Sequence, residues 1–218
     1  MILENPQLLI IAGPNGAGKS TFSKDLSAAG AFIFDADKEI LRIEAQFPGL
    51  PIDSVSYAVQ QYFLDCVDDA LKNRTYFTIE TNFRDGELMN TVSRFKDNGY
   101  VVSMVYIGLS DIKQSMDRVT ARVQGGGHFV DTGSIRYNYE EGLKNLIHFA
   151  DRFDNIEIID ASGNLYEPHS LLSVQNKQLV FVSPNAPRWA VPALSKIAGY
   201  FGSLDRDEDM GFRRGPRR

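Results

Sequence analysis

The chain has 218 residues, 43% of them apolar, so it can bury one substantial hydrophobic core. Its formal net charge of -5 at pH 7 argues against a protein that coats nucleic acid or binds an anionic membrane. Cys66 is the only cysteine, and the sequence shows neither a leader peptide nor a membrane-spanning apolar run, so we expect a protein of the reducing cytoplasm.

The first predicted element is a strand over residues 7–12, which leads into a glycine-rich loop and then into a helix over 18–28. The loop reads Gly13-Pro14-Asn15-Gly16-Ala17-Gly18-Lys19-Ser20-Thr21 and contains the pattern G-x-x-x-x-G-K-[ST]. In this arrangement, backbone N–H groups and the helix N-terminus hold phosphate oxygens. Lys19 is predicted to reach the β- and γ-phosphates, and the Ser20 hydroxyl to bind Mg²⁺. The sequence therefore predicts a nucleoside triphosphate site.

Downstream, short apolar runs alternate with helical patterns, which is typical of βαβ units and a mainly parallel sheet. The further predicted strands are 31–34, 75–79, 101–107 and 156–160, and the further predicted helices are 37–46, 53–73, 85–98, 111–123 and 134–150. We predict a three-layer α/β/α fold of the P-loop NTPase class with a mainly parallel five-stranded sheet.

Acidic and polar residues follow two of these predicted strands. The second strand runs into Asp35-Ala36-Asp37, and the third runs into Glu80-Thr81-Asn82. Ligands of parallel sheets bind at the carboxyl ends of the strands, so these residues should share one rim with the glycine-rich loop. A carboxylate there can orient and deprotonate an attacking hydroxyl during phosphoryl transfer. We interpret Asp37 and Glu80 in this way, whereas Asp35 alone is better explained as a helix N-cap.

The predicted helix at 111–123 carries Arg118 and Arg122, which are four residues apart and so share one face. Gly125-Gly126-Gly127-His128 then interrupts the helical pattern. One interpretation is a lid that closes over the γ-phosphate and stabilises its charge. Equally supported is a surface role in which the arginines pair with Asp117 or with Glu140 and Glu141.

The pattern changes beyond residue 162. Residues 171–174 and 178–182 predict a hairpin, and a short amphipathic helix is predicted around 190–200. We interpret residues 1–162 as the P-loop core, 163–202 as an extension of the same domain, and 203–218 as a flexible charged tail.

Four stretches together resemble the zeta-toxin family of P-loop kinases and its relatives described as predicted ATPases. They are Gly13 to Thr21, Phe34 to Asp37, Glu80 to Asn82, and Arg118 to His128, with Ile135 to Leu146 continuing the last match. The resemblance covers about residues 7–162. The arginine–Gly-Gly-His block and the later Gly-Leu-x-Asn-Leu are its most specific parts.

The resemblance implies a kinase that uses ATP and Mg²⁺. The best-known members phosphorylate the sugar 3′-hydroxyl of UDP-N-acetylglucosamine, and paired antitoxins block their nucleotide site. It implies that Asp37 is the base for the acceptor hydroxyl and that Lys19 and Ser20 hold phosphate and Mg²⁺. The remaining implied residues are Glu80, Thr81, Asn82, Asp35 and His128 towards the acceptor, and Arg118, Arg122 and Arg136 towards the triphosphate.

Two positions depart from the family pattern. Asp35 stands where Asn is usual, and Arg136-Tyr137-Asn138-Tyr139 stands where many members have paired arginines before a tyrosine. Only Arg136 remains of that pair, one position early, and a helix turns by about 100° per residue, which can direct the guanidinium away from phosphate.

Two other functions stay open at this point. A P-loop ATPase could use hydrolysis for conformational change, although the chain lacks L-S-G-G-Q and a strand that ends in Asp-Glu. A nucleotide-binding regulator with little turnover would accord with the reduced arginine pair.

Overall fold

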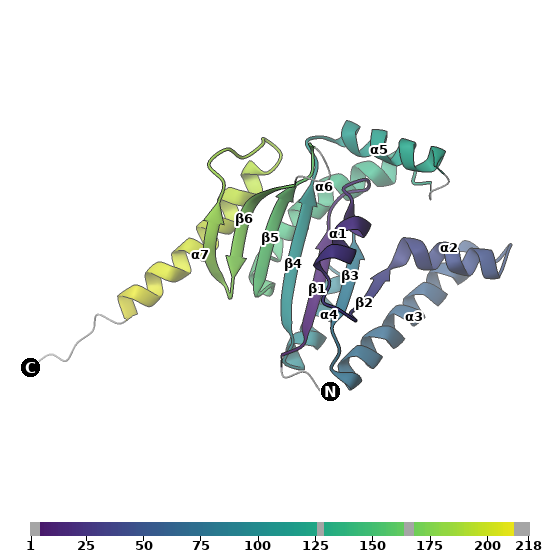
Figure 1. Ribbon diagram of the computed structural model, residues 1–218, viewed down its shortest axis with the longest axis horizontal. Coiled ribbons are helices and arrows are strands. Elements are labelled where there is room, and N and C mark those ends of the chain that lie inside the picture. The colour runs from purple at the N-terminus through teal and green to yellow at the C-terminus, as the bar shows by residue number, and fades with distance from the viewer. Residues whose placement is uncertain (1–4, 126–128, 164–167, 212–218) are drawn as a thin grey trace, which may run out of the picture.

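The computed structural model describes the backbone of residues 5–125, 129–163 and 168–211, and the side chains of those residues as far as Gly202. Within these ranges, seven strands form one sheet in the order β2-β3-β1-β4-β5-β6-β7 (Figure 1). They are β1 (Gln7–Ala12), β2 (Phe32–Asp35), β3 (Phe77–Thr81), β4 (Val101–Gly108), β5 (Asn155–Asp160), β6 (His169–Gln175) and β7 (Gln178–Val182).

The strands β1 to β5 run parallel, so their carboxyl ends meet at one edge of the sheet. In the register of this edge, Glu80 of β3 lies between Asp35 of β2 and Ile11 of β1. The glycine-rich loop begins directly after β1. The predicted rim of acidic residues beside this loop is therefore present.

The sheet is larger than the five strands predicted, because the two strands of the C-terminal hairpin join it beside β5. Strand β6 pairs antiparallel with β5 and places Leu172 opposite Ile158 and Val174 opposite Ile156. The turn to β7 consists of Asn176 and Lys177, at φ +49° and +62°. Two such left-handed residues suit a tight hairpin turn.

The helices are α1 (Lys19–Leu26), α2 (Ala36–Gln46), α3 (Ile52–Asn73), α4 (Leu88–Asp97), α5 (Ile112–Gln124), α6 (Thr132–His148) and α7 (Val191–Gly211). Helices α2 and α3 project together from the β2 side of the sheet, and α5 lies across its carboxyl edge (Figure 1). Helix α7 continues past the predicted end at residue 200 into the stretch predicted as a flexible tail, and 212–218 lie outside the described residues. None of the helices in the described part of the chain has the length and hydrophobicity that a bilayer crossing demands.

Apolar side chains are buried on both faces of the sheet. Leu8 and Ile10 of β1 belong to the larger cluster, while Leu9 and Ile11 belong to a smaller one with Phe22 of α1. Continuous apolar strands of this kind are expected where helices cover both faces of a parallel sheet. The larger cluster also includes residues of β6 and α7, so the C-terminal elements share the main core.

Candidate active site

The loop between β1 and α1 requires glycine at two positions for steric reasons. Gly13 has φ +146°, and a Cβ there would lie 2.2 Å from the carbonyl oxygen of Ile107. Gly16 has φ +80°, and a Cβ there would lie 2.9 Å from Cβ of Arg118. Glycine at these positions permits the tight curl of the backbone, and α1 begins directly after it at Lys19, with its N-terminus facing the loop.

Lys19 folds back over this loop. Its Nζ donates hydrogen bonds to the carbonyl oxygens of Gly13 (2.9 Å) and Pro14 (3.1 Å) and to Asn82 Oδ1 (2.7 Å). Burial lowers the pKa of Lys19 to about 8, and the negative charge of nearby carboxylates, Asp37 first among them, opposes that shift. The ammonium is therefore held at the loop by neutral oxygen atoms, where an anion would stabilise its charge.

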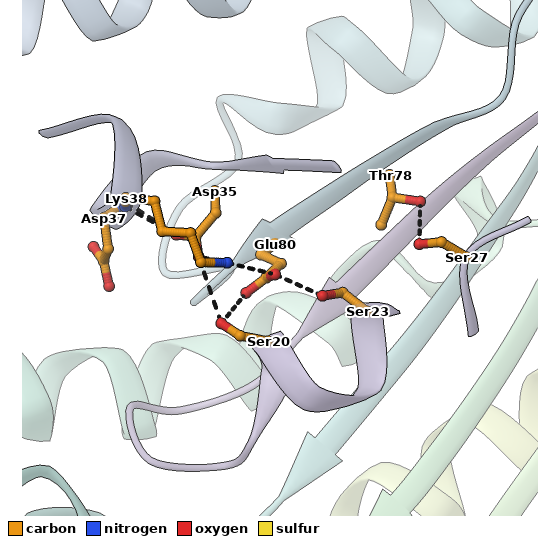
Figure 2. Close-up of polar contacts among 8 residues, drawn as sticks. All are labelled: Ser20, Ser23, Ser27, Asp35, Asp37, Lys38, Thr78 and Glu80. Atoms are coloured by element: carbon orange, nitrogen blue, oxygen red, sulfur yellow. Dashed lines mark hydrogen bonds and ion pairs between the residues drawn. The ribbon is translucent and has the colours of Figure 1, made fainter. Parts of the chain in front are cut away.

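Glu80, at the end of β3, connects the sheet to α1. Its side chain is buried, with Oε2 accepting from the Ser20 hydroxyl at 2.6 Å and Oε1 accepting from the Ser23 hydroxyl at 2.6 Å (Figure 2). Sequence reasoning identified Ser20 and Glu80 but missed Ser23. A serine one turn after Ser20 is no signal by itself, because its role depends on the distant Glu80.

Asp35 is the N-cap of α2, and its second carboxylate oxygen faces the site. Its Oδ1 caps α2 by accepting from the backbone N–H of Asp37 (3.1 Å) and of Lys38 (3.4 Å). Its Oδ2 faces the site, 2.7 Å from Lys38 Nζ and 3.5 Å from the Ser20 hydroxyl. Burial by itself lowers the pKa of Lys38, but the hydrogen bond from Lys38 to Asp35 and the charges of Asp35 and Glu80 outweigh it and raise that pKa. Sequence reasoning missed Lys38.

The oxygen atoms gathered here fit Mg²⁺. The Ser20 hydroxyl and the carboxylates of Asp35 and Glu80 are hard donors of the kind this ion prefers. Within the described residues, no three His, Cys, Asp or Glu side chains form a metal-binding cluster. In general, Mg²⁺ at phosphate-transfer sites is bound through one or two carboxylates together with water and substrate phosphates.

Asp37 occupies the first turn of α2. Figure 2 shows its carboxylate directed away from the cluster formed by Asp35, Lys38 and Glu80. It nevertheless lines the same cavity as Lys19 and Ser20. The structure thus brings together the strand-end acids and the phosphate loop, as the parallel sheet predicted.

The cavity has a volume of about 810 Å³, within the usual range for small-molecule sites. The loop lines one part of it with Asn15, Gly16, Gly18, Lys19, Ser20 and Thr21. Another part is lined by Thr81, Asn82 and by residues that sequence reasoning did not identify, namely Ile40, Leu41, Phe83, Arg84, Asp85 and Leu88. Gly13, Pro14 and Ala17 are not part of this lining, and the carbonyl oxygens of Gly13 and Pro14 accept from Lys19.

The two arginines of α5 have different surroundings. Arg118 donates to three backbone carbonyl oxygens, those of Gly16 (3.3 Å), Ala161 (2.8 Å) and Gly163 (3.3 Å), and burial lowers the pKa of its guanidinium. It therefore ties the phosphate loop to the segment after β5. Arg122, one turn further on, lines the cavity together with Arg118. Arg118 therefore has a structural role in addition to its place in the cavity.

The proposed surface pairs of these arginines are not observed within the described residues, where the three acids pair elsewhere. The observed pairs are Lys113–Asp117 (2.6 Å), Arg136–Glu140 (3.9 Å) and Lys144–Glu141 (2.7 Å).

The site can now be compared with known proteins. The Zeta toxin family model matches residues 3–170 of the chain. The chain belongs to the zeta-toxin family. A sequence relative in Haemophilus influenzae, an uncharacterised protein, is 28% identical over 139 residues, which are 63% of this chain and 95% of the relative.

Solved structures share the fold of this zeta-toxin family member. The structure from the PezAT chromosomal toxin–antitoxin system of Streptococcus pneumoniae has a TM-score of 0.63 at 14% identity, and the match covers 93% of this chain and 88% of that chain. A chain of the AvrRxo1-ORF1:AvrRxo1-ORF2 complex with sulphate ions has a TM-score of 0.64 at 14% identity. The match covers 88% of this chain and 64% of that chain, so this chain spans less than two thirds of that protein. The predicted α/β P-loop fold is confirmed.

Arg136, another residue that the zeta-toxin resemblance implied, is not part of the cavity lining. Arg136 lies on α6 with 59% of its side chain exposed, 3.9 Å from Glu140. This position accords with the rotation expected from its one-residue displacement. His128 lies outside the described residues.

Helix α6 supports the site through amide side chains that sequence reasoning did not assign. The buried Asn138 donates to Asn15 Oδ1 at 2.8 Å, which ties the helix to the phosphate loop. Asn145 donates to the carbonyl oxygen of Phe83 at 2.9 Å, which holds the turn after β3. The Gly-Leu-x-Asn-Leu segment was part of the zeta-toxin resemblance, but its physical role depends on this long-range contact.

Proposed function

We propose that this zeta-toxin family protein is a kinase that uses ATP and Mg²⁺ to phosphorylate a hydroxyl group of a small molecule. The observation that carries the proposal is a single cavity that Lys19, Ser20 and Asp37 line together. A phosphate site alone would serve any nucleotide-binding protein. A carboxylate in the same cavity adds the group that a hydroxyl acceptor requires.

In the proposed reaction, the acceptor hydroxyl transfers its proton to the Asp37 carboxylate while its oxygen bonds to the γ-phosphorus. The bond from that phosphorus to the β–γ bridging oxygen breaks, and ADP leaves with the electron pair. Lys19 and the loop N–H groups hold the phosphates, and Arg122 stabilises the charge that they develop. Ser20, Glu80 and Asp35 would hold Mg²⁺, which supplies charge neutralisation on the triphosphate.

We propose a nucleotide-sugar as the acceptor, with a sugar hydroxyl of UDP-N-acetylglucosamine as the first compound to test. The support is family membership and a cavity that extends beyond the phosphate loop past Thr81 and Asn82 to Phe83 and Leu88. A cognate antitoxin and a cytoplasmic location belong to the same proposal. The antitoxin is supported by two structures of this fold, which come from a toxin–antitoxin system and from a two-protein complex that has also been solved with ATP. The cytoplasmic location rests on family membership alone.

One assay separates this proposal from the ATPase and the regulator. The full chain is incubated with ATP and MgCl₂, with and without UDP-N-acetylglucosamine or a panel of hydroxyl compounds, and both ADP and phosphorylated acceptor are quantified by mass spectrometry. A kinase forms ADP in proportion to the phosphorylated acceptor. Acceptor-independent ADP formation would identify an ATPase, and bound but intact ATP would identify a regulator.

A further inference from the structure

Lys38 lies in the site, but the proposed reaction does not use it. Its ammonium nitrogen is 2.7 Å from Asp35 Oδ2 and 3.4 Å from Glu80 Oε1 (Figure 2). The Ser20 hydroxyl contacts the same two carboxylates, at 3.5 Å and 2.6 Å. A positive charge belonging to the chain itself therefore sits among the oxygen atoms that fit Mg²⁺.

The carboxylates of Asp35 and Glu80 are held in place by other contacts, whereas the Lys38 side chain can change its rotamer. Asp35 is held by capping α2, and Glu80 is only 7% exposed and bound by the buried Ser23 hydroxyl. The Lys38 side chain is 54% exposed. Its four-carbon stem can turn into solvent without disturbing the core, because it is not part of the buried clusters.

Resting on the proposed function, we propose that Lys38 is an internal counterion of the metal position, which neutralises Asp35 and Glu80 in the nucleotide-free protein and withdraws when Mg²⁺ enters with ATP. Two carboxylates at close range repel each other unless a cation stands between them. The ammonium and a divalent ion provide the same neutralisation and cannot occupy one place together. Lys38 should therefore compete with Mg²⁺.

This competition has two opposite consequences for nucleotide binding. Without metal, Lys38 keeps the negative carboxylates from repelling the triphosphate, so it should support binding of metal-free ATP. With metal, Lys38 must leave, so it should raise the Mg²⁺ concentration that the complex requires. A lysine that merely binds a phosphate oxygen would strengthen ATP binding under both conditions.

The test measures ATP binding to the full chain by isothermal titration calorimetry, once in EDTA and once across a MgCl₂ series. We expect Lys38→Met to weaken binding of metal-free ATP about tenfold, as for the loss of a charge-assisted contact. The half-saturating Mg²⁺ concentration should fall by a similar factor, with ATP affinity at excess MgCl₂ equal to wild type or higher. Lys38→Arg retains the charge and should restore the wild-type binding of metal-free ATP.

The matched control is Arg42→Gln, which removes one positive charge from the same helix at a side chain that pairs with Glu39 at 2.6 Å. It should leave both measurements unchanged. Equal weakening by Lys38→Met with and without metal would make Lys38 a phosphate ligand and overturn the inference, as would an unchanged Mg²⁺ requirement. Failure of the wild-type chain to bind ATP under any condition would instead refute the proposed function.

Discussion

Asp37 and Lys19 line the same cavity yet should fail in different ways when they are replaced. Asp37→Asn keeps the shape and the hydrogen-bonding capacity of the side chain but removes its basicity. We expect ATP affinity to stay within about twofold of wild type, while phosphoryl transfer falls by about 10²–10⁴-fold, the usual contribution of a general base. Single-turnover transfer and calorimetric ATP binding check the two parts separately.

The control for Asp37 is Asp97→Asn, which changes an exposed aspartate at the end of α4. It should leave both rates and affinities at wild-type values. Full transfer activity in Asp37→Asn would remove this carboxylate from the base role and leave only a nucleotide pocket.

Lys19 should give nucleotide binding a pH dependence in the alkaline range. Burial lowers its pKa to about 8 in the free protein, and the negative phosphates of bound ATP would raise that pKa. Above pH 8, binding therefore requires uptake of a proton, so the affinity for metal-free ATP should be level below about pH 7.5 and fall by up to tenfold per pH unit above 8. Calorimetry between pH 6.5 and about 9.5 in EDTA measures this decline.

Lys19→Arg separates this effect from other titrations, because a guanidinium keeps its proton throughout that range. Its ATP affinity should be lower than that of wild type but level with pH. The same decline in Lys19→Arg would assign the titration to another group.

Individual site residues could be predicted where the residues that act together are neighbours in the sequence. The glycine pattern with Lys19 and Ser20 is local, and the acids at strand ends follow from the parallel sheet. Lys38 and Ser23 were missed because their importance depends on Glu80, which is 42 and 57 residues away in the chain. Charge pairing across strands leaves no local pattern in the sequence.

Helix α5 carries the next prediction, which concerns its two arginines. Arg118→Ala removes three bonds to backbone carbonyls and should lower the free energy of unfolding by about 1–3 kcal/mol and weaken ATP binding. Arg122→Ala should slow transfer by about 10²-fold, as the loss of one group that stabilises developing charge.

Urea unfolding and single-turnover kinetics on both variants decide this prediction. Unchanged stability of Arg118→Ala in urea would contradict its role in holding the phosphate loop. Wild-type rates of phosphoryl transfer in both variants would show that α5 has only a structural role.

At the level of helices and strands, hydrophobic periodicity located most elements. The predicted and observed elements differ where the observed arrangement depends on pairing between separate segments of the chain. The hairpin of β6 and β7 was predicted, but not its place at the edge of the sheet, because the pairing with β5 depends on matching Leu172 with Ile158 across the connection between the two strands. Helix α7 was predicted too short because its charged continuation has no apolar periodicity. The supports that α6 gives through Asn138 and Asn145 were missed for the same reason as Lys38.

The whole chain should unfold as one unit if the C-terminal elements belong to the domain of the phosphate loop. Phe201 of α7 is 0% exposed and lies in the same apolar cluster as Leu8 of β1. We expect Phe201→Ala to lower the free energy of unfolding by about 3–5 kcal/mol, the range for removing a buried phenyl ring. Val191→Ala, on an exposed residue of the same helix, should cost less than about 1 kcal/mol.

Two probes in urea make the test decisive, because they report on different parts of the chain. Trp189 is the only tryptophan, and it packs against Gly108 and Tyr106 near the start of α7. Its fluorescence therefore follows the C-terminal elements. Far-ultraviolet circular dichroism follows the whole fold. The two curves should coincide in wild type and shift together in Phe201→Ala, as in a two-state transition. A fluorescence transition that precedes the loss of circular dichroism would instead make residues 163–202 a separately folding unit. The phosphate loop would then keep its fold without them, and α7 could be changed without effect on ATP binding.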